Sequence, residues 1–208
     1  MTIAFPQRFF DRTDDGPDPV FYGPRRLVTH IDDAAIAALG DHYRDLGVTG
    51  DVLDLMSSWV SHLPERPRHL AVLGMNPLEL THNAAAHLRV VGDLNRTPVL
   101  PFADGSFDDV VCCVSVDYLT QPVEVFVEVA RVLRPGGRFV VSISNRCFPT
   151  KAIRGWLATD DRGHVEIVRA YFSASGAFGP VSVAPLTPRP GTRSDLLVAL
   201  HAAATPAD

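Results

Sequence analysis

The chain has 208 residues, of which 46% are hydrophobic and 21% charged, values that are ordinary for a folded globular protein. Its formal net charge is −5, so it lacks the basic field that binds nucleic acid or an anionic membrane, and we expect neither as a partner. We expect a cytoplasmic location, because the N-terminus lacks a signal-like apolar segment and no apolar run approaches the ~20 residues that span a bilayer. Three cysteines cannot form a disulfide framework, and the histidines show no metal-binding spacing, so no metal is expected.

The N-terminal part predicts an irregular arm followed by a helix. Residues 1–24 mix proline, charge and aromatic side chains without a period, and the many aromatic rings indicate an arm that docks on the domain. A helix is predicted next, capped by Asp32 or Asp33, because the apolar residues up to Tyr43 recur on one face. Gly47 ends this helix before the first strand.

From residue 51 onward, strand and helix signals alternate. Helices are predicted from Ser57 after the first strand, and over 77–86, 122–133, 151–157 and 160–173. The last two strands are joined by TPRPGTR, which has no room for a helix, so they should form an antiparallel hairpin. The expected fold is α/β, a doubly wound, mostly parallel seven-stranded sheet in a single domain over residues 1–208. The predicted strands are 51–55, 69–73, 87–91, 109–116, 138–143, 180–184 and 195–200.

The predicted topology brings polar groups together at one edge of the sheet. Ligands of open α/β sheets bind above the carboxyl ends of the strands, where the strand order reverses. The first, second and fourth strands end in residues 54–59, 74–76 and 115–118, and Asp93 follows the third. The fourth strand is continuously apolar, as a central strand covered on both faces needs to be. The sequence therefore predicts a small-molecule site at this edge.

Two segments resemble the class I S-adenosylmethionine-dependent methyltransferases, in the branch often called type 11. The similarity is carried by LPFADGSFDDVV (residues 100–111) and EVFVEVARVLRPGGRFVVSIS (residues 124–144), with looser matches at 51–55 and 90–94. The resemblance implies a Rossmann-like fold, S-adenosyl-L-methionine as cofactor, and O-, N- or C-methylation of a small molecule. It also implies that residues 1–50 cover the pocket of an α/β core formed by residues 51–208.

Carried over by position, the resemblance implies a cofactor site with two departures from the family pattern. The turn after the first strand would face the methionine part of the cofactor, but Met56-Ser57-Ser58 replaces the G-x-G of the family. Asn76 stands where the family has an acidic residue for the ribose hydroxyls, and an amide loses the charge-assisted bond. Asp93 and Leu94 would reach the adenine amino group and ring, and Val114 and Ser115 would line the floor under the sulfonium. The implied cofactor-binding residues are Asp54, Met56, Ser57, Ser58, Trp59, Asn76, Asp93, Leu94, Val114 and Ser115.

Two of these positions have a structural alternative that the sequence leaves open. Asn76 precedes Pro77 and could act as a helix N-cap, a role that can coexist with ligand binding. Asp93 follows Gly92 and could be a turn residue. A second function also stays open, a methyltransferase-fold protein without methyl transfer that serves as a binding or partner subunit or performs other chemistry. A dinucleotide-dependent oxidoreductase is disfavoured, because G-x-G-x-x-G is absent.

The candidates for catalysis and substrate binding come mostly from the ends of the fourth and fifth strands. Methyl transfer needs a nucleophile placed in line with the methyl group, and a base where the nucleophile carries a proton. Arg146 and Lys151 would suit a carboxylate or phosphate on a small substrate. The catalytic candidates are Asp117, Tyr118 and His30, the last as base or lid, and the substrate-binding candidates are Asn145, Arg146 and Lys151. The oligomeric state does not follow from the sequence.

Overall fold

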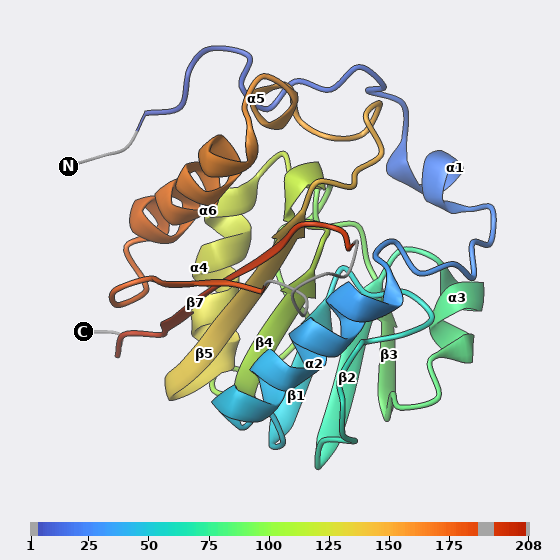
Figure 1. Cartoon of the computed structure of the whole chain (residues 1–208), viewed down its shortest axis with the longest axis vertical. Coiled ribbons are helices and arrows are strands. Elements are labelled where there is room, and N and C mark those ends of the chain that lie inside the picture. The colour runs from blue at the N-terminus through green and yellow to red at the C-terminus, as the bar shows by residue number, and fades with distance from the viewer. Residues whose placement is uncertain (1–3, 187–193, 207–208) are drawn as a thin grey trace.

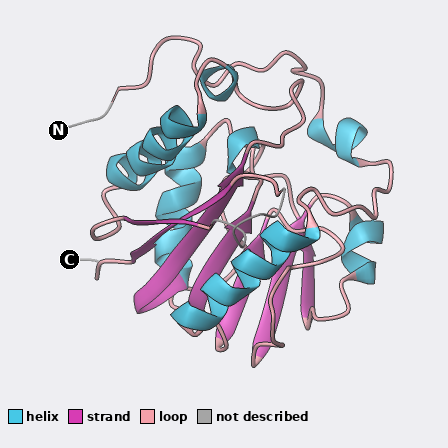
Figure 2. Cartoon of the chain, viewed as in Figure 1, coloured by secondary structure: helices cyan, strands magenta, loops and turns pink. Residues whose placement is uncertain are grey.

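The computed structural model describes residues 4–186 and 194–206, and a seven-stranded sheet lies at its centre (Figure 1, Figure 2). The strand order is β3-β2-β1-β4-β5-β7-β6. Neighbouring strands from β3 to β5 are parallel, and β7 is antiparallel to both β5 and β6, so the predicted fold class is confirmed. The strands are β1 (Asp51–Leu55), β2 (His69–Gly74), β3 (Leu88–Val91), β4 (Phe107–Cys113), β5 (Leu133–Ser144), β6 (Ser182–Pro185) and β7 (Leu197–Ala203).

Helices cover both faces of the sheet. α2 lies across one face, and α4 and α6 pack together on the other (Figure 1). The buried apolar side chains accordingly form two layers, one around α2 and a larger one around α4 and α6. The helices are α1 (Asp18–Tyr22), α2 (Asp33–Leu46), α3 (Pro77–His82), α4 (Pro122–Val132), α5 (Arg154–Leu157) and α6 (Asp161–Ser175), with a 3-10 turn, η1, at Val116–Tyr118.

Local sequence signals account for the position of α2 and β4. Asp32 caps α2 as predicted, because its carboxylate accepts a hydrogen bond from the backbone N–H of Ala35 at 2.8 Å. Gly47 ends the helix in the left-handed conformation at φ 68°, where glycine carries no steric penalty. β4 lies between β1 and β5 in the middle of the sheet, which its continuously apolar sequence predicted.

The predicted helix after β1 is wrong. Residues 56–68, all of them described, form an irregular connection to β2. Pro64 and Pro67 fall inside this segment, and each removes a backbone donor that a helix would need. Ser57 instead donates its backbone N–H to the carbonyl oxygen of Leu73 in β2, at 2.7 Å. The chain therefore leaves β1 without a helix and turns over the end of β2.

Other predicted boundaries also differ from the structure, two of them by four or more residues. α3 ends at His82 rather than near residue 86. The Arg89 side chain bonds the carbonyl oxygens of Leu80 and Asn83, which occupies acceptors that a longer helix would use. β5 begins at Leu133, whereas the strand was predicted to begin at residue 138, so residues 134–137 belong to the strand as well.

The N-terminal arm docks on the domain as predicted and crosses the carboxyl edge of the sheet (Figure 1). The rings of Phe5 and Phe10 lie 5.6 and 6.3 Å from the ring of Tyr171 in α6. Arg12 forms an antiparallel bridge with Ile153 just before α5. The arm also contains the short helix α1, which the aperiodic sequence did not predict.

The C-terminal strands pair as predicted. Val183 of β6 lies opposite Leu200 of β7 in an antiparallel register. The segment 187–193, predicted to join these strands, lies outside the described residues. No helix within the described ranges is both long enough and apolar enough to cross a bilayer.

Candidate functional site

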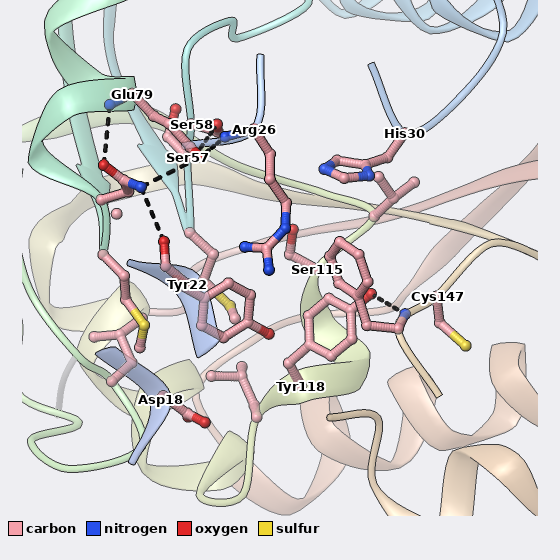
Figure 3. A pocket seen from close by; sticks show the side chains of 18 of the residues that line it. Asp18, Tyr22, Arg26, His30, Ser57, Ser58, Glu79, Ser115, Tyr118 and Cys147 are labelled. Carbon is pink, nitrogen blue, oxygen red and sulfur yellow. Dashed lines mark hydrogen bonds between the residues drawn. The ribbon is translucent and has the colours of Figure 1, made fainter. Parts of the chain in front are cut away.

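A cavity of about 520 Å³ opens at the carboxyl edge of the sheet, under the N-terminal segment (Figure 3). The ends of β1, β2, β3 and β4 line one side of it, and residues from the segment 18–32 line the other. The strand order reverses between β1 and β4, so the cavity lies where this class of sheet binds ligands. The residues predicted for the site that line the cavity are His30, Met56, Ser57, Ser58, Asn76, Asp93, Leu94, Val114, Ser115, Tyr118 and Arg146.

The backbone is in the left-handed region at two strand ends beside the cavity. Met56 after β1 has φ 57°, and Val114 after β4 has φ 43°. Residues other than glycine rarely adopt this region, because it strains their backbone. Backbone strain of this kind concentrates at ligand sites. Met56 stands at the first glycine of the family G-x-G, so the loop retains a backbone shape that glycine favours although its residue differs.

Asp54 and Trp59 do not line the cavity, contrary to the prediction. Asp54 is 2% exposed, and its carboxylate accepts a hydrogen bond from Ser57 Oγ at 2.5 Å. Burial raises the pKa of Asp54 to about 7. The indole N–H of Trp59 donates to the carbonyl oxygen of Val28 at 3.0 Å. Both side chains therefore position the loop and the covering segment rather than a ligand.

Asn76 is both a helix cap and a latch for the N-terminal segment. Its Oδ1 accepts from the backbone N–H groups of Leu78 and Glu79 at 3.0 and 3.2 Å, which confirms the N-cap alternative. Its Nδ2 donates to the carbonyl oxygens of Tyr22 and Gly23 at 2.9 and 3.0 Å (Figure 3). Every polar group of the amide is thus bonded, and none is left for a ribose hydroxyl, which corrects the role implied by the resemblance.

Glu79 is the acidic residue that reaches this side of the cavity, and the sequence analysis missed it. Its Oε1 accepts from the backbone N–H of Arg26, and its Oε2 accepts from Ser58 Oγ, both at 2.6 Å (Figure 3). Oε1 also accepts from Asn76 Nδ2 at 3.4 Å, and because a carboxylate has about four acceptor positions, about one remains available. The spacing Asn76-x-x-Glu79 was the available signal, because a glutamate three residues after a cap folds back towards it.

Asp93 and Leu94 lie at the end of β3 on the same side. Asp93 Oδ1 accepts from the N–H groups of Asn95 and Arg96 at 3.0 and 3.3 Å, which confirms the turn alternative. The second carboxylate oxygen has no hydrogen-bond partner among the described residues, so it remains available to a ligand. Leu94 is 4% exposed and supplies an apolar surface beside it.

Of the three catalytic candidates, His30 and Tyr118 line the cavity and Asp117 does not. The His30 ring lies 5.2 Å from the ring of Phe148, and burial lowers its pKa, which leaves the imidazole neutral at pH 7. The Tyr118 hydroxyl accepts from the Phe148 N–H at 2.8 Å, and burial raises its pKa, so it keeps its proton. Asp117 is 3% exposed, and burial raises its pKa to about 8. The side chain of Asp117 cannot reach a ligand, which corrects the prediction.

The three predicted substrate-binding residues have different surroundings. Arg146 lines the cavity, but its Nε donates to Asp195 at 2.9 Å. Asn145 is exposed and lies off the cavity. Lys151 is fully buried, with Nζ 3.0 Å from a carboxylate oxygen of Asp18, and its role is to hold the arm. The prediction for Lys151 is therefore wrong, because its side chain does not line the cavity and Asp18 already neutralises its charge.

Comparisons with known proteins agree with this architecture. Residues 72–141 match the family described as methyltransferase domain. Demethylmenaquinone methyltransferase of Mycobacterium sp. (strain KMS) is 44% identical over 66 residues, which cover 30% of this chain and 27% of that enzyme. The S-adenosylmethionine-dependent methyltransferase of Mesorhizobium loti has a TM-score of 0.54 at 18% identity, covering 80% of this chain and 97% of that one. The cyclase SpnF has a TM-score of 0.59 at 14% identity, covering 90% and 91%.

The matched segment and the structural neighbours show what the chain resembles. The chain has the fold of the class I methyltransferases, and the resemblance to their type 11 branch is confirmed by the match over residues 72–141. This chain aligns with about a quarter of the length of the curated relatives, 27% for the enzyme of strain KMS.

Proposed function

We propose that this chain transfers a methyl group from S-adenosyl-L-methionine to a small molecule. The observation that carries the proposal is the cavity of about 520 Å³ at the ends of β1, β2, β3 and β4, in a chain whose residues 72–141 match the methyltransferase family. The cavity combines apolar surface with carboxylate, hydroxyl and imidazole groups from segments distant in sequence. Such convergence of a few polar groups in an apolar pocket is typical of small-molecule sites.

The residues present fit the proposed cofactor, with one exchange of roles. Met56 retains the left-handed backbone of the glycine loop, so Ser57 and Ser58 would hold the methionine part. Glu79 replaces the fully bonded Asn76 as the acceptor for ribose hydroxyls. Asp93 would accept from the adenine amino group, with Leu94, Val114 and Ser115 beside the ring and the sulfonium. When bound, S-adenosyl-L-methionine supplies an electrophilic methyl group.

The chain's own contribution to the reaction is placement, exclusion of water and proton handling. His30 is neutral at pH 7 because burial lowers its pKa, so its imidazole would accept a proton from the substrate nucleophile. Tyr118 keeps its proton and would donate a hydrogen bond to the substrate. The segment 18–32 and Phe148 cover the cavity, which limits access of water to the reacting atoms.

Calorimetry with S-adenosyl-L-methionine and S-adenosyl-L-homocysteine tests the proposal. We expect saturable binding of both, and at least about tenfold weaker binding to Asp93→Ala, which loses a charged acceptor. Asp104→Ala is the matched control, because that carboxylate is 81% exposed and lies away from the cavity. Absence of both heat and a thermal shift at millimolar ligand would exclude the cofactor and with it the proposal.

A second candidate function is supported by the departures at the cofactor loop. A protein of this fold without methyl transfer would tolerate the loss of G-x-G and the use of Asn76 as a latch. The cyclase SpnF, which shares the fold at a TM-score of 0.59, has a name that denotes a different reaction. Failure to bind the cofactor, together with a stable fold, would favour this candidate.

A further inference from the structure

The cavity contains a cation that the sequence analysis overlooked. Arg26 lines the cavity, and its side chain runs from beside Glu79 towards the rings of Tyr22 and Tyr118 (Figure 3). Its guanidinium donates to the carbonyl oxygens of Phe21 at 2.9 Å and Pro24 at 3.3 Å. A guanidinium has five N–H donors, so three have no acceptor within the described part of the chain.

Arg26 differs from the other cations near the cavity because no carboxylate in the described part of the chain pairs with its guanidinium. Arg146 pairs with Asp195 at 2.9 Å, and Lys151 pairs with Asp18 at 3.0 Å. No carboxylate oxygen of residues 4–186 or 194–206 lies within 4.0 Å of the Arg26 guanidinium nitrogens. A positive group with free donors at a cavity is suited to a carboxylate, which it can bind through two parallel hydrogen bonds.

Aromatic rings surround this guanidinium. Its central carbon lies 4.9 Å from the ring centroid of Phe21 and 5.7 Å from that of Phe148, which fixes the group by cation–π contact. Phe148, Tyr22 and Tyr118 also line the cavity, so the surface beside the cation is aromatic. The Tyr22 hydroxyl is buried and has no partner among the described residues. A flat apolar body with a polar substituent would bury these rings and satisfy that hydroxyl.

We infer that the substrate is a small aromatic carboxylic acid whose carboxylate binds Arg26. The inference rests on the proposed function where it calls the acid a substrate and S-adenosyl-L-methionine the second ligand. The binding of an aromatic acid itself is argued from the Arg26 guanidinium and the aromatic rings alone. It also replaces Arg146 and Lys151 as the anion-binding residues, because the carboxylates of Asp195 and Asp18 already neutralise those two. Arg26 is here a specificity-determining residue, since it selects the acid over its neutral amide.

The test uses the full chain with benzoate, phenylacetate and indole-3-acetate, each compared with its primary amide by calorimetry at saturating S-adenosyl-L-homocysteine. We expect at least one acid to bind at least about tenfold more tightly than its amide, the range of a charge-assisted bond. Arg26→Gln should remove this preference and leave amide binding unchanged. Arg25→Gln is the matched control, because it removes the same charge from an exposed neighbouring side chain that does not line the cavity.

The outcomes separate the inference from the proposed function. No acid binding, or acid binding that Arg26→Gln does not weaken, overturns the inference. If Arg26→Gln weakens S-adenosyl-L-homocysteine but not methylthioadenosine, which lacks the carboxylate, the guanidinium serves the cofactor and the inference is overturned. Arg26-dependent acid binding, measured without added S-adenosyl-L-homocysteine in a chain that binds no cofactor, would sustain the acid site at Arg26 while the proposed function fails.

Discussion

At the scale of single residues, the site is decided by which polar groups remain unbonded. Asn76 lines the cavity, yet its amide is used completely by the cap and by two carbonyl oxygens of the N-terminal segment. Glu79 and Asp93 keep acceptor positions that are not used. A residue's position in a family pattern therefore predicts its place at the site, while its hydrogen bonds decide what it can bind.

Asn76→Asp tests the latch. A carboxylate can still cap α3, but it cannot donate to the carbonyl oxygens of Tyr22 and Gly23 and is repelled by them. We expect a loss of about 1–3 kcal/mol in the free energy of unfolding, because buried acceptors lose their donor. The measurement is urea unfolding, with limited proteolysis of the N-terminal segment. Asn145→Asp, at an exposed site, should change neither; equal effects of the two substitutions would contradict the latch.

Asp117 predicts a pH dependence of stability. Burial raises its pKa to about 8, whereas in the unfolded chain it titrates near 4. Between these values the native state binds the extra proton, so this carboxyl lowers stability as pH rises, by about 1.4 kcal/mol per pH unit. Asp117→Asn should remove that slope and stabilise the protein more at pH 8 than at pH 5. Urea unfolding at both pH values measures it, and a pH-independent difference would show that Asp117 does not carry the slope.

At the scale of elements, the loop after β1 is shaped by the end of β2. Gly74 allows the chain to pass over this strand, since a Cβ there would lie 2.0 Å from the carbonyl oxygen of Ser57. The same loop donates the Ser57 N–H to Leu73. The missing helix after β1 and the left-handed Met56 are both parts of this close crossing. Contacts between the loop after β1 and the end of β2 thus fix the shape that the glycine-rich turn has in the family.

Gly74→Ala is expected to displace that loop. The clash is with backbone, so it cannot be relieved by a side-chain rotation, and we expect a loss of about 1–3 kcal/mol in stability together with weaker cofactor binding. Gly92→Ala, at a cavity-lining position after β3, is the matched control for stability, because a Cβ there would meet only Leu73 side-chain atoms at 3.6 Å or more. Thermal unfolding and calorimetry measure both effects. Identical behaviour of the two variants would contradict the close crossing.

At the scale of the whole molecule, the N-terminal arm and the residues that follow it form a strap that runs from α6 to α2 over the carboxyl edge of the sheet (Figure 1), and residues of its segment 18–32 line the cavity. The Asp18 carboxylate holds the strap in place. Asp18 is 3% exposed, and its carboxylate forms hydrogen bonds or ion pairs with Arg12, Lys151 and Asn95 at 2.8 to 3.0 Å. Lys151 is the only lysine of the chain and is fully buried. The strap therefore depends on charges that are removed from water.

Asp18→Ala should release the strap. It leaves the charges of Lys151 and Arg12 buried with fewer partners, and breaking such a network costs about 3–5 kcal/mol. Modification of Lys151 by an amine-reactive reagent, followed by peptide mapping, should be slow in the wild type and fast in the variant. Asp15→Ala, an exposed neighbour, should leave the rate unchanged. Fast modification of the wild-type lysine would contradict the strap.

The sequence by itself determined the sheet, the point at which its strand order reverses, and the edge at which the cavity opens. Local patterns specify these features: apolar runs such as β4, the cap at Asp32, the left-handed end at Gly47 and the short link before β7. Asp93 and Leu94 were also placed correctly beside the cavity, because a residue that follows a parallel strand must emerge at that edge. These inferences need only the period and the order of the elements.

Only the tertiary structure decided which of the candidate residues are available to a ligand. The sequence placed Lys151 and Asn76 at the site, but contacts with Asp18 and Tyr22, 133 and 54 positions away, use their polar groups. Arg26 lies between the aperiodic arm (residues 1–24) and the helix that begins at Asp33, in a stretch that carries no local signal, so its position at the cavity follows from packing alone. Such contacts depend on chain segments that are distant in sequence, and no local pattern encodes which of them meet.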